Sequence, residues 1–434
     1  MNKKNCFHII CLLFLTIMTR ALLLYLIEPA DYSIFFNHTL KNKAKANDDQ
    51  IDMIILGTSR PHRTFDPVIF EEVLGLNSVY NASSGLQPIE ASYYMAREII
   101  QRYHPKYMIL DITAGTLYSQ NATLEKVIVL DRLHGINKLE YLINCFEPEE
   151  YLNALSLCYR FRNNFTADKI RDIVEEKKTL KNNGYTERWA GEDLYTKNGF
   201  IYSYQTGKID NTLSENYNYG NPLPKKMEYL NKIVNLCGDN GIQLFLVTSP
   251  WSMMFMYTSK NYQDFTDFMT EYASAHNLSY FNLNYLRGRE TWLGDDLMFD
   301  AGHVNGAGAE LVSEKYAQIL KSLIRKEEIP DLLYEDISEV KKSADRILGI
   351  GADISIVDLT ATVHISSTQT ENIDPLYRVQ LSTDDVNFTP LTDWTSETDF
   401  RFPMEGYKGT AHFLIEAMSP TGEPGVDITY HIPI

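Results

Sequence analysis

The sequence has few cysteines, and its positive charge is not clustered. Its five cysteines are Cys6, Cys11, Cys145, Cys158 and Cys237. None stands in the CxxC spacing that is typical of zinc sites. A disulfide between Cys145 and Cys158 and buried free thiols both remain open, and free thiols are favoured. Because no residue pattern indicates a metal or cofactor, the expectation is that the chain uses neither.

Acidic residues outnumber basic ones by 57 to 40, which gives a formal net charge of −17. A nucleic-acid footprint needs clustered Lys and Arg to neutralise phosphates, so nucleic acid is not an expected partner. The same charge disfavours adhesion to an anionic lipid surface. A chain of 434 residues is long enough for roughly two or three domains.

The one long hydrophobic run of the sequence lies at the N-terminus. From Cys6 to Ile27 it is almost wholly apolar and about long enough to span a bilayer as a helix, with Lys3 and Lys4 before it. This pattern predicts a single-pass anchor at residues 1–30 and an extracytoplasmic location for the rest. Arg20 interrupts the run, but its long side chain can reach the headgroups. A cleaved signal peptide is the alternative, weakened by the lack of an A-x-A site.

Residues 31–50 are polar and are interpreted as a stalk, and residues 51–326 then alternate between strand and helix patterns. Strands are expected at 51–57, 78–82, 107–112, 242–248 and 279–283, and helices at 67–73, 88–103, 227–236, 265–275 and 306–324. This alternation predicts a three-layer α/β sandwich with a parallel sheet. An insertion at 117–222, rich in Tyr and Asn, is expected to form a lid or a substrate wall.

The C-terminal part of the chain follows a different pattern. Residues 327–345 are charged and are interpreted as a linker. Short alternating strands separated by turn residues then fill 346–434, which predicts an all-β sandwich of immunoglobulin or fibronectin-III type. Such a domain usually binds or positions rather than catalyses.

Two separated motifs carry residues suited to nucleophilic catalysis. Gly57-Thr58-Ser59 ends the first strand, where open α/β sheets place their ligand crevice, and the glycine permits the tight turn. Asp300-Ala-Gly-His303 lies near the end of the α/β segment, with Asn305 as the expected cap of the next helix. The three-residue spacing predicts a carboxylate beside an imidazole, an arrangement that fixes the ring so that its other nitrogen can activate a serine.

These motifs, together with Gly85 in Ser83-Ser84-Gly85, resemble three of the four sequence blocks of SGNH/GDSL hydrolases. The stretch 55–67 is similar to the first block of the branch that acts in cell-envelope polymer acylation, which includes alginate O-acetylation and teichoic-acid D-alanylation proteins. The resemblance covers roughly residues 50–326 and implies the flavodoxin-like SGNH fold.

The resemblance also implies a role for each matching residue. Ser59 forms the acyl-enzyme, His303 shuttles protons and Asp300 orients His303. The backbone N–H groups of Ser59 and Gly85 stabilise the oxyanion.

One block of the family is missing. Where the family has Gly-x-Asn-Asp after the third strand, this chain reads Asp111-Ile-Thr-Ala-Gly115. The third oxyanion donor is therefore unassigned, and Asn81, Arg60 or a residue of the turn 248–251 is the candidate replacement.

Several of these residues also have structural interpretations. Ser59 and Asp300 can be ordinary turn residues, although their joint placement favours catalysis. His62 is expected to be a surface histidine, and Arg60 and Arg63 either hold an anionic polymer or form structural ion pairs. Some aromatic residues can stack on sugars but are more often core, namely Trp189, Tyr195, Trp251, Tyr262 and Trp292.

The sequence therefore favours an extracytoplasmic serine esterase or O-acyltransferase that acts on an extracellular polysaccharide. In the transferase form, a multi-span membrane protein is the expected partner that supplies the acyl group. The alternative is a catalytically silent glycan-binding or scaffold protein.

Overall fold

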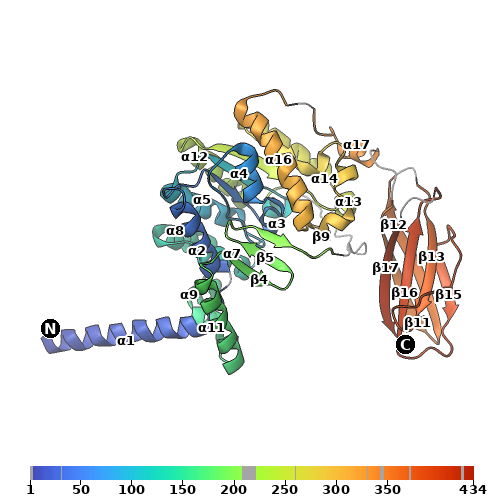
Figure 1. Ribbon diagram of the computed structural model, residues 1–434, viewed down its shortest axis with the longest axis horizontal. Helices are drawn as coiled ribbons and strands as arrows, with labels where there is room; N and C mark the ends of the chain where they lie inside the picture. The colour runs from blue at the N-terminus through green and yellow to red at the C-terminus, as the bar shows by residue number, and fades with distance from the viewer. Residues whose placement is uncertain are drawn as a thin grey trace. The chain divides into compact units, whose positions relative to one another are not determined.

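The computed structural model describes residues 3–30, 32–207, 221–259, 261–329, 331–342, 347–370, 373–421 and 425–434 (Figure 1). Across these residues the chain divides into two compact units. Unit 1 comprises Met1–Tyr204, Pro222–Leu246 and Val312–Lys321, and unit 2 comprises Gln205–Asn221, Val247–Leu311 and Ser322–Ile434.

The α/β part is built on a sheet with the strand order β2-β1-β3-β7-β8. These strands are β1 (Met53–Leu56), β2 (Val79–Asn81), β3 (Tyr107–Asp111), β7 (Gln243–Thr248) and β8 (Ser279–Asn282). β1 pairs in parallel with β2 and β3, so that Ile55 lies opposite both Asn81 and Ile109. Every residue of β1 is buried, as expected for an apolar run inside a parallel sheet. This is the strand order of flavodoxin-like folds, which confirms the predicted parallel α/β core.

The five helices that the sequence predicts in this α/β segment all form. They are α4 (Pro67–Leu74), α5 (Ile89–Tyr103), α12 (Pro224–Asp239), α14 (Tyr262–Ala275) and α16 (Gly306–Arg325). Asp66 caps α4 by accepting a hydrogen bond of 2.9 Å from the backbone N–H of Val68, and Pro67 takes the first helical position. The shorter helices α3 (Ser59–Thr64), α13 (Met253–Thr258) and α15 (Arg289–Trp292) lie in the loops.

Helix α1 (Lys3–Ile27) lies within residues 1–30, the segment that the sequence predicts to be a membrane anchor. Cys6, Ile9 and Ile10 of that anchor lie outside the residues whose side chains are described. No helix among the described residues has both the length and the apolar character needed to cross a membrane.

The prediction of a stalk at residues 31–50 is wrong. The segment forms helix α2 (Tyr32–Lys45), and its Phe35, Phe36 and Thr39 are buried in unit 1. The Thr39 hydroxyl lies 2.7 Å from that of Tyr80 on β2. The lysines make the sequence of this segment polar, although α2 also has a face of apolar side chains. Burial of that face holds α2 against unit 1.

The insertion between β3 and β7 contains short helices and an antiparallel sheet of order β4-β5-β6. Its elements are α6 (Ala114–Tyr118), α7 (Thr123–Leu130), α8 (Gly135–Cys145), α9 (Tyr151–Leu155), α10 (Leu157–Arg160), α11 (Ala167–Asn182), β4 (Glu187–Ala190), β5 (Asp193–Thr196) and β6 (Ile201–Ser203). Residues 208–220 of the predicted insertion lie outside the described residues.

The turn between β5 and β6 docks on the end of β2. The backbone N–H of Asn81 donates to the carbonyl of Asn198 at 2.9 Å. Gly199 has φ +79°, and a Cβ atom there would lie 2.1 Å from the carbonyl oxygen of Asn81, so only glycine fits this contact. The insertion therefore forms a wall beside β2, while its predicted role toward a substrate stays a prediction.

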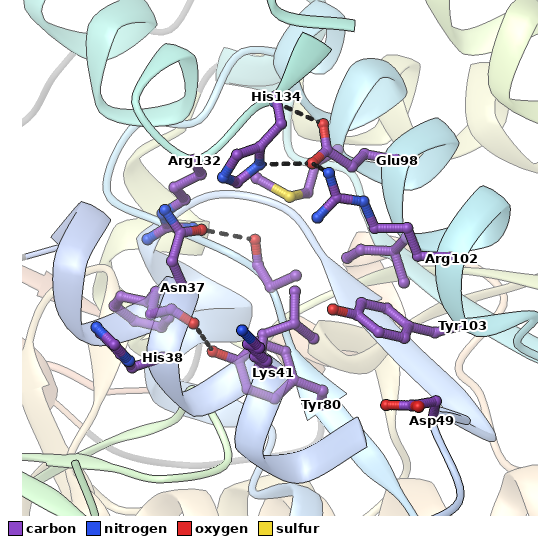
Figure 2. Close-up of a pocket in the computed structure, with 15 residues that line it drawn as sticks. Asn37, His38, Lys41, Asp49, Tyr80, Glu98, Arg102, Tyr103, Arg132 and His134 are labelled. Atoms are coloured by element: carbon purple, nitrogen blue, oxygen red, sulfur yellow. Dashed lines mark hydrogen bonds and ion pairs between the residues drawn. The ribbon is translucent and has the colours of Figure 1, made fainter. Parts of the chain in front are cut away.

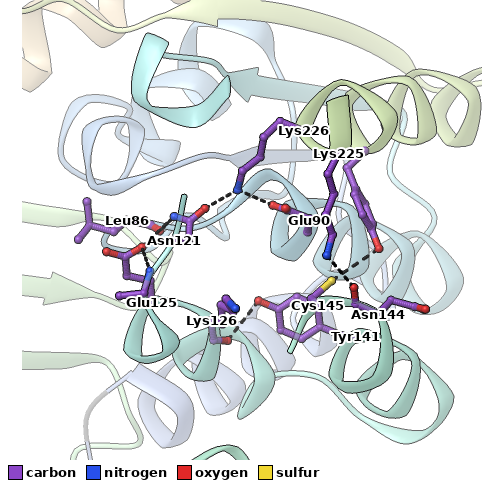
Figure 3. Close-up of polar contacts among 12 residues, drawn as sticks. Leu86, Glu90, Asn121, Glu125, Lys126, Tyr141, Asn144, Cys145, Lys225 and Lys226 are labelled. Carbon is purple, nitrogen blue, oxygen red and sulfur yellow. Dashed lines mark hydrogen bonds and ion pairs between the residues drawn. The ribbon is translucent and has the colours of Figure 1, made fainter. Parts of the chain in front are cut away.

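A buried polar cluster connects the insertion to two helices of the α/β core (Figure 3). Lys226 on α12 and Glu90 on α5 form an ion pair of 2.9 Å, with side chains only 3% and 9% exposed. Lys226 also contacts the side-chain oxygen of Asn121, whose amide nitrogen donates to Glu125 at 2.8 Å and to the carbonyl of Leu86 at 3.5 Å. The cluster thus fixes the start of α5 and the loop before it.

The C-terminal residues form antiparallel sheets of order β11-β12-β15 and β14-β13-β16-β17. The strands are β11 (Ile347–Val357), β12 (Thr360–Gln369), β13 (Leu376–Ser382), β14 (Thr389–Pro390), β15 (Asp399–Pro403), β16 (Thr410–Met418) and β17 (Val426–Pro433). Both sheets contribute to one hydrophobic cluster, with Val363 on β12 and Val379 on β13 fully buried. The predicted strands are therefore present, and the immunoglobulin or fibronectin-III type stays a prediction. The predicted linker, residues 327–345, contains helix α17 (Ile337–Lys342).

The described cysteines are free thiols. Cys145 and Cys237 are buried, Cys158 is half-buried and Cys11 is exposed, with no disulfide among these four. Burial raises the pKa of Cys237 to about 12, so this thiol is an inert core residue at neutral pH.

The buried ion pair gives a direct test of the packing between α5 and α12. Lys226→Ala leaves the Glu90 carboxylate buried without its cation, so the free energy of unfolding should fall by about 3 kcal/mol. The matched control is Lys232→Ala on the same helix, whose pair with Glu228 is exposed and should contribute less than about 1 kcal/mol. Urea unfolding of the full chain measures both, and equal losses in the two variants would contradict the assigned burial.

Candidate active site

The turn after β1 places Ser59 at the start of a helix. Gly57 has φ +150°, and a Cβ atom there would lie 2.7 Å from Cγ of Pro61 and 2.9 Å from Cβ of Asp111. The backbone can make this turn only without a side chain, as the sequence predicts. The Thr58 hydroxyl then caps α3 by accepting a hydrogen bond of 3.4 Å from the backbone N–H of Arg60.

Ser59 is the first residue of α3 and is half-buried. The backbone N–H of a residue in the first helical turn points out of the helix rather than to a carbonyl inside it. The side chain and the N–H group of Ser59 therefore belong to the same turn at the carboxyl end of β1. A nucleophile that also contributes an oxyanion donor needs this arrangement.

The loop after β2 lies directly against this turn. The backbone N–H of Ser84 donates to the carbonyl of Gly57 at 3.3 Å, which joins the two loops. The Ser84 hydroxyl donates to the side-chain oxygen of Gln87 at 2.8 Å, and Gln87 in turn donates to Ser92 on α5 at 3.0 Å. Gly85, the expected oxyanion donor, is thus brought beside the turn that carries Ser59.

Asn81 holds the two loops together. Its side-chain nitrogen donates to the carbonyls of Pro61 and Phe65 at 2.7 and 3.0 Å, and its side-chain oxygen accepts from the backbone N–H of Ser83 at 3.1 Å. The side chain is fully buried. Since both amide hydrogens are used inside the protein, Asn81 positions the site and does not serve as a replacement oxyanion donor.

Arg132 supports the same loop from its other side. Its guanidinium is buried, donates to the carbonyls of Ala82 and Ser83 at 3.4 Å each, and lies 4.2 Å from the ring centre of Phe36. It lines a cavity of about 360 Å³ between α2, β2 and α5 (Figure 2). Nothing in the sequence around Arg132 indicates these contacts, because they join segments that are far apart along the chain.

A carboxylate in this cavity is held in its charged form. Burial by itself raises the pKa of Glu98, but hydrogen bonds from the side chain and backbone N–H of His134 and the charge of Arg102 outweigh it and lower the pKa. The Glu98 carboxylate accepts from His134 Nδ1 at 2.7 Å, and Arg102 lies 3.1 Å away. Figure 2 shows these groups pointing toward one another at one end of the cavity.

Asp300 and His303 form the second half of the predicted triad. They lie opposite each other on the hairpin of β9 (Met298–Asp300) and β10 (His303–Val304). Nδ1 of His303 lies 2.8 and 2.9 Å from the two carboxylate oxygens of Asp300. The backbone N–H of Gly302 also donates to Asp300 at 2.7 Å. The predicted contact between carboxylate and imidazole is therefore confirmed, and with Nδ1 engaged, Nε2 is the nitrogen that can accept a proton.

Asn305 fixes this hairpin to the next helix. Its side-chain oxygen accepts from the backbone N–H of Gly308 at 3.0 Å, which caps α16 as the sequence predicts. Its side-chain nitrogen donates to the carbonyl of Asp296 at 2.9 Å. Asn305 thus ties the backbone that follows His303 both to α16 and to Asp296.

The other candidates near Ser59 have different surroundings in the structure. Arg63 forms a two-pronged ion pair with Asp193 on β5, at 2.9 and 2.6 Å, as the structural interpretation expects. Arg60 is half-buried on α3, one residue after Ser59. The expectation of a surface position for His62 is wrong, because its ring is buried and packs on Phe36 with the ring centres 5.3 Å apart.

Another candidate for the third oxyanion donor is the turn after β7, residues 248–251. This turn contacts the Asp300–His303 hairpin at its end, where the backbone N–H of Ser252 donates to the carbonyl of Ala301 at 2.9 Å. Its backbone is further anchored by Asn284, which accepts from the N–H of Trp251 at 2.8 Å. Trp251 itself is buried and therefore belongs to the core rather than to a sugar-binding surface.

The structure thus gives two local assemblies. The first, in unit 1, joins Ser59, Asn81 and Gly85 through their loops, and the second, in unit 2, joins Asp300 and His303. The catalytic assignment of Ser59, Asp300 and His303 as one triad stays a prediction.

No family model and no curated protein matches the chain. Solved structures that match are a protein of Bacteroides fragilis described as an acylhydrolase (11% identity, TM-score 0.30), a GDSL-like lipase of Bacteroides thetaiotaomicron (10%, 0.30) and a psychrotrophic esterase of Pseudoalteromonas (12%, 0.28). These alignments cover 66%, 67% and 63% of this chain and 97%, 98% and 99% of the respective matches.

The two glycines of the first assembly should respond differently to substitution. Gly57→Ala forces a side chain onto Pro61 and Asp111 at a φ that favours glycine, so it should lower the free energy of unfolding by about 1–3 kcal/mol. Gly85→Ala is the matched control, since a Cβ atom there meets nothing within 4 Å. Thermal unfolding of both variants measures the difference, and a Gly57→Ala variant as stable as Gly85→Ala would disprove the described turn.

Proposed function

We propose that this chain is a serine esterase or O-acyltransferase that works through an acyl-Ser59 intermediate. The observation that carries the proposal is the Asp300–His303 contact, in which both carboxylate oxygens lie within 2.9 Å of Nδ1. Such a contact fixes the imidazole tautomer and stabilises the imidazolium that forms when the ring takes a proton. Paired with a serine at the mouth of a parallel sheet, it supports acyl transfer.

The proposed reaction has two stages. Ser59 Oγ attacks the ester carbonyl while His303 Nε2 takes its proton, and the backbone N–H groups of Ser59 and Gly85 stabilise the negative oxygen. His303 then gives the proton to the leaving alcohol, which leaves an acyl group on Ser59. In the second stage His303 takes a proton from water or a sugar hydroxyl, whose oxygen attacks the acyl carbonyl. The bond between the acyl group and Ser59 Oγ then breaks, and His303 returns the proton to that oxygen.

We propose a polysaccharide as the acceptor or substrate. Trp189 on β4 is 52% exposed and stacks on Tyr204, itself 60% exposed, with ring centres 5.7 Å apart and planes 21° apart. Exposed, nearly parallel aromatic rings suit the apolar faces of sugars. The pair lies in the insertion, where the sequence predicts a substrate wall.

We also propose that the N-terminal segment holds the chain at a membrane, with the bulk of the chain extracytoplasmic. The support is the apolar run 6–27 behind Lys3 and Lys4, and the exposed side chains of Leu12 and Phe14 on α1. In the transferase form, a multi-span membrane protein would supply the acyl group to Ser59.

Removal of the nucleophile or of the base should abolish esterase activity. Ser59→Ala and His303→Ala should each lower kcat on p-nitrophenyl acetate by at least about a thousandfold, and Asp300→Asn should have a comparable effect through the imidazole tautomer. The matched control is His364→Ala, because His364 makes the same kind of contact with Asp399, at 2.8 Å, in the C-terminal domain. Full activity in Ser59→Ala would refute the acyl-enzyme.

The same assay with an oligosaccharide acceptor separates the two forms of the enzyme. A transferase should release p-nitrophenol and place the acetyl group on the sugar, which mass spectrometry detects. Release of p-nitrophenol with no acetylated sugar would leave the esterase form and remove the transferase form.

A glycan-binding protein without turnover is the second candidate, and the exposed Trp189–Tyr204 pair favours it as much as it favours the enzyme. A fluorophosphonate probe distinguishes the two, since only an activated serine reacts with it. The enzyme should become labelled on Ser59, and His303→Ala should lose the label. Polysaccharide binding by a chain that takes up no label would establish the second candidate.

A further inference from the structure

Three side chains of the types that can ligate metal ions lie close together in the C-terminal domain. His412 on β16 and His431 on β17 are direct cross-strand partners, and their Nδ1 atoms lie 2.6 Å apart. The Asp385 carboxylate lies 3.4 Å from Nδ1 of His412. One atom from each of the three residues falls within 4.8 Å of the others.

The fold brings Asp385 to this pair. Ser382, at the end of β13, is the cross-strand partner of His412, so the loop that follows β13 passes over the histidine. Asp384 braces this loop by accepting from the backbone N–H groups of Val386 and Asn387 at 3.0 and 2.8 Å. Asp385 itself takes φ +60°, which turns the chain there. Three segments distant in the sequence thus deliver one ligand each.

We propose that Asp385, His412 and His431 form a site for a divalent transition-metal ion, of which Zn²⁺ is the representative. Two imidazoles and one carboxylate are typical protein ligands of such ions, whereas Ca²⁺ and Mg²⁺ prefer sets made wholly of oxygen. Ligand bonds of about 2.0–2.2 Å at tetrahedral angles separate ligand atoms by about 3.3–3.5 Å. The distance between Asp385 and His412 already has this value.

The two imidazoles need only a small adjustment. Their Nδ1 atoms at 2.6 Å must separate by roughly 0.7 Å to bind one tetrahedral ion, which small rotations of the two rings achieve. In the metal-bound form both Nδ1 lone pairs point at the cation, and the hydrogen bond between the rings is replaced. His431 and Asp385 are exposed, so water can fill the fourth position.

This site has a structural consequence. The ion would connect β17, the last strand of the chain, to β16 and to the loop after β13. Since the three ligands converge only in the folded domain, binding stabilises the native state by mass action. The site is separate from the proposed catalytic residues and does not depend on the proposed esterase activity.

The C-terminal domain also contains a histidine–carboxylate pair that serves as a comparison for this site. His364 and Asp399 pair at 2.8 Å on adjacent strands of the same domain. That pair is a single imidazole with a single carboxylate, and no third ligand joins it among the described residues. It therefore provides a control for weak binding by a surface histidine and a carboxylate.

The test uses the full chain after treatment with a chelator. Zn²⁺ titration by calorimetry should show one saturable equivalent in the wild type and in His364→Ala. His412→Ala and His431→Ala should each lose that equivalent, and Asp385→Asn should bind more weakly. Co²⁺ should give the visible absorption of a tetrahedral centre in the wild type and not in His431→Ala, and Zn²⁺ should raise the melting temperature only where the site is intact.

Thermal unfolding of the metal-free variants shows whether each variant is folded. If His412→Ala is unstable, His431→Ala still tests the proposal, because the His431 side chain is exposed. The proposal is overturned if folded His431→Ala binds Zn²⁺ as tightly as the wild type does. It is also overturned if the wild type binds no Zn²⁺. Loss of binding in His364→Ala with retention in His412→Ala would likewise assign the metal elsewhere.

Discussion

A serine hydroxyl attacks an ester only if a base removes its proton, and the base must present the correct nitrogen. In the proposed mechanism that condition depends on the Asp300 carboxylate, whose two oxygens lie 2.8 and 2.9 Å from Nδ1 of His303. Loss of this contact would free the ring to rotate or change tautomer, and the proposed activation of Ser59 would fail. The hairpin, the Asn305 cap and α16 all serve to hold these two side chains in place.

The position of Ser59 depends on backbone geometry rather than on charge. Gly57 allows the turn, Thr58 caps α3, and Asn81 ties α3 to the loop after β2. The contact from Ser84 N–H to the Gly57 carbonyl brings the Gly85 loop to the same place. A rigid frame of this kind is needed for oxyanion donors, because they stabilise the transition state only when they are already aimed at it.

The sequence predicted the parts of this structure that are local. Apolar runs marked the strands of the α/β sheet, Asp66-Pro67 and Asn305 marked helix starts, and the spacing of Asp300 and His303 predicted their contact. Contacts that depend on long-range packing were not predictable. The lysines of α2 give no sign that its Phe35 and Phe36 are buried. His62 is buried between Phe36 of α2 and Tyr195 of β5, and Arg132 of the insertion contacts the carbonyl of Ser83 after β2. The histidines of the proposed metal site are 19 residues apart and meet only through strand register.

The proposed enzyme requires that Ser59 and the Asp300–His303 pair act together in one site. A crystal structure of the chain after reaction with a phosphonate ester shows whether they do. We expect a covalent bond between Ser59 Oγ and phosphorus, with Nε2 of His303 within about 3 Å of an adduct oxygen and the N–H groups of Ser59 and Gly85 donating to another. An adduct on a different residue, or one on Ser59 with the His303 ring out of hydrogen-bonding reach, would contradict it.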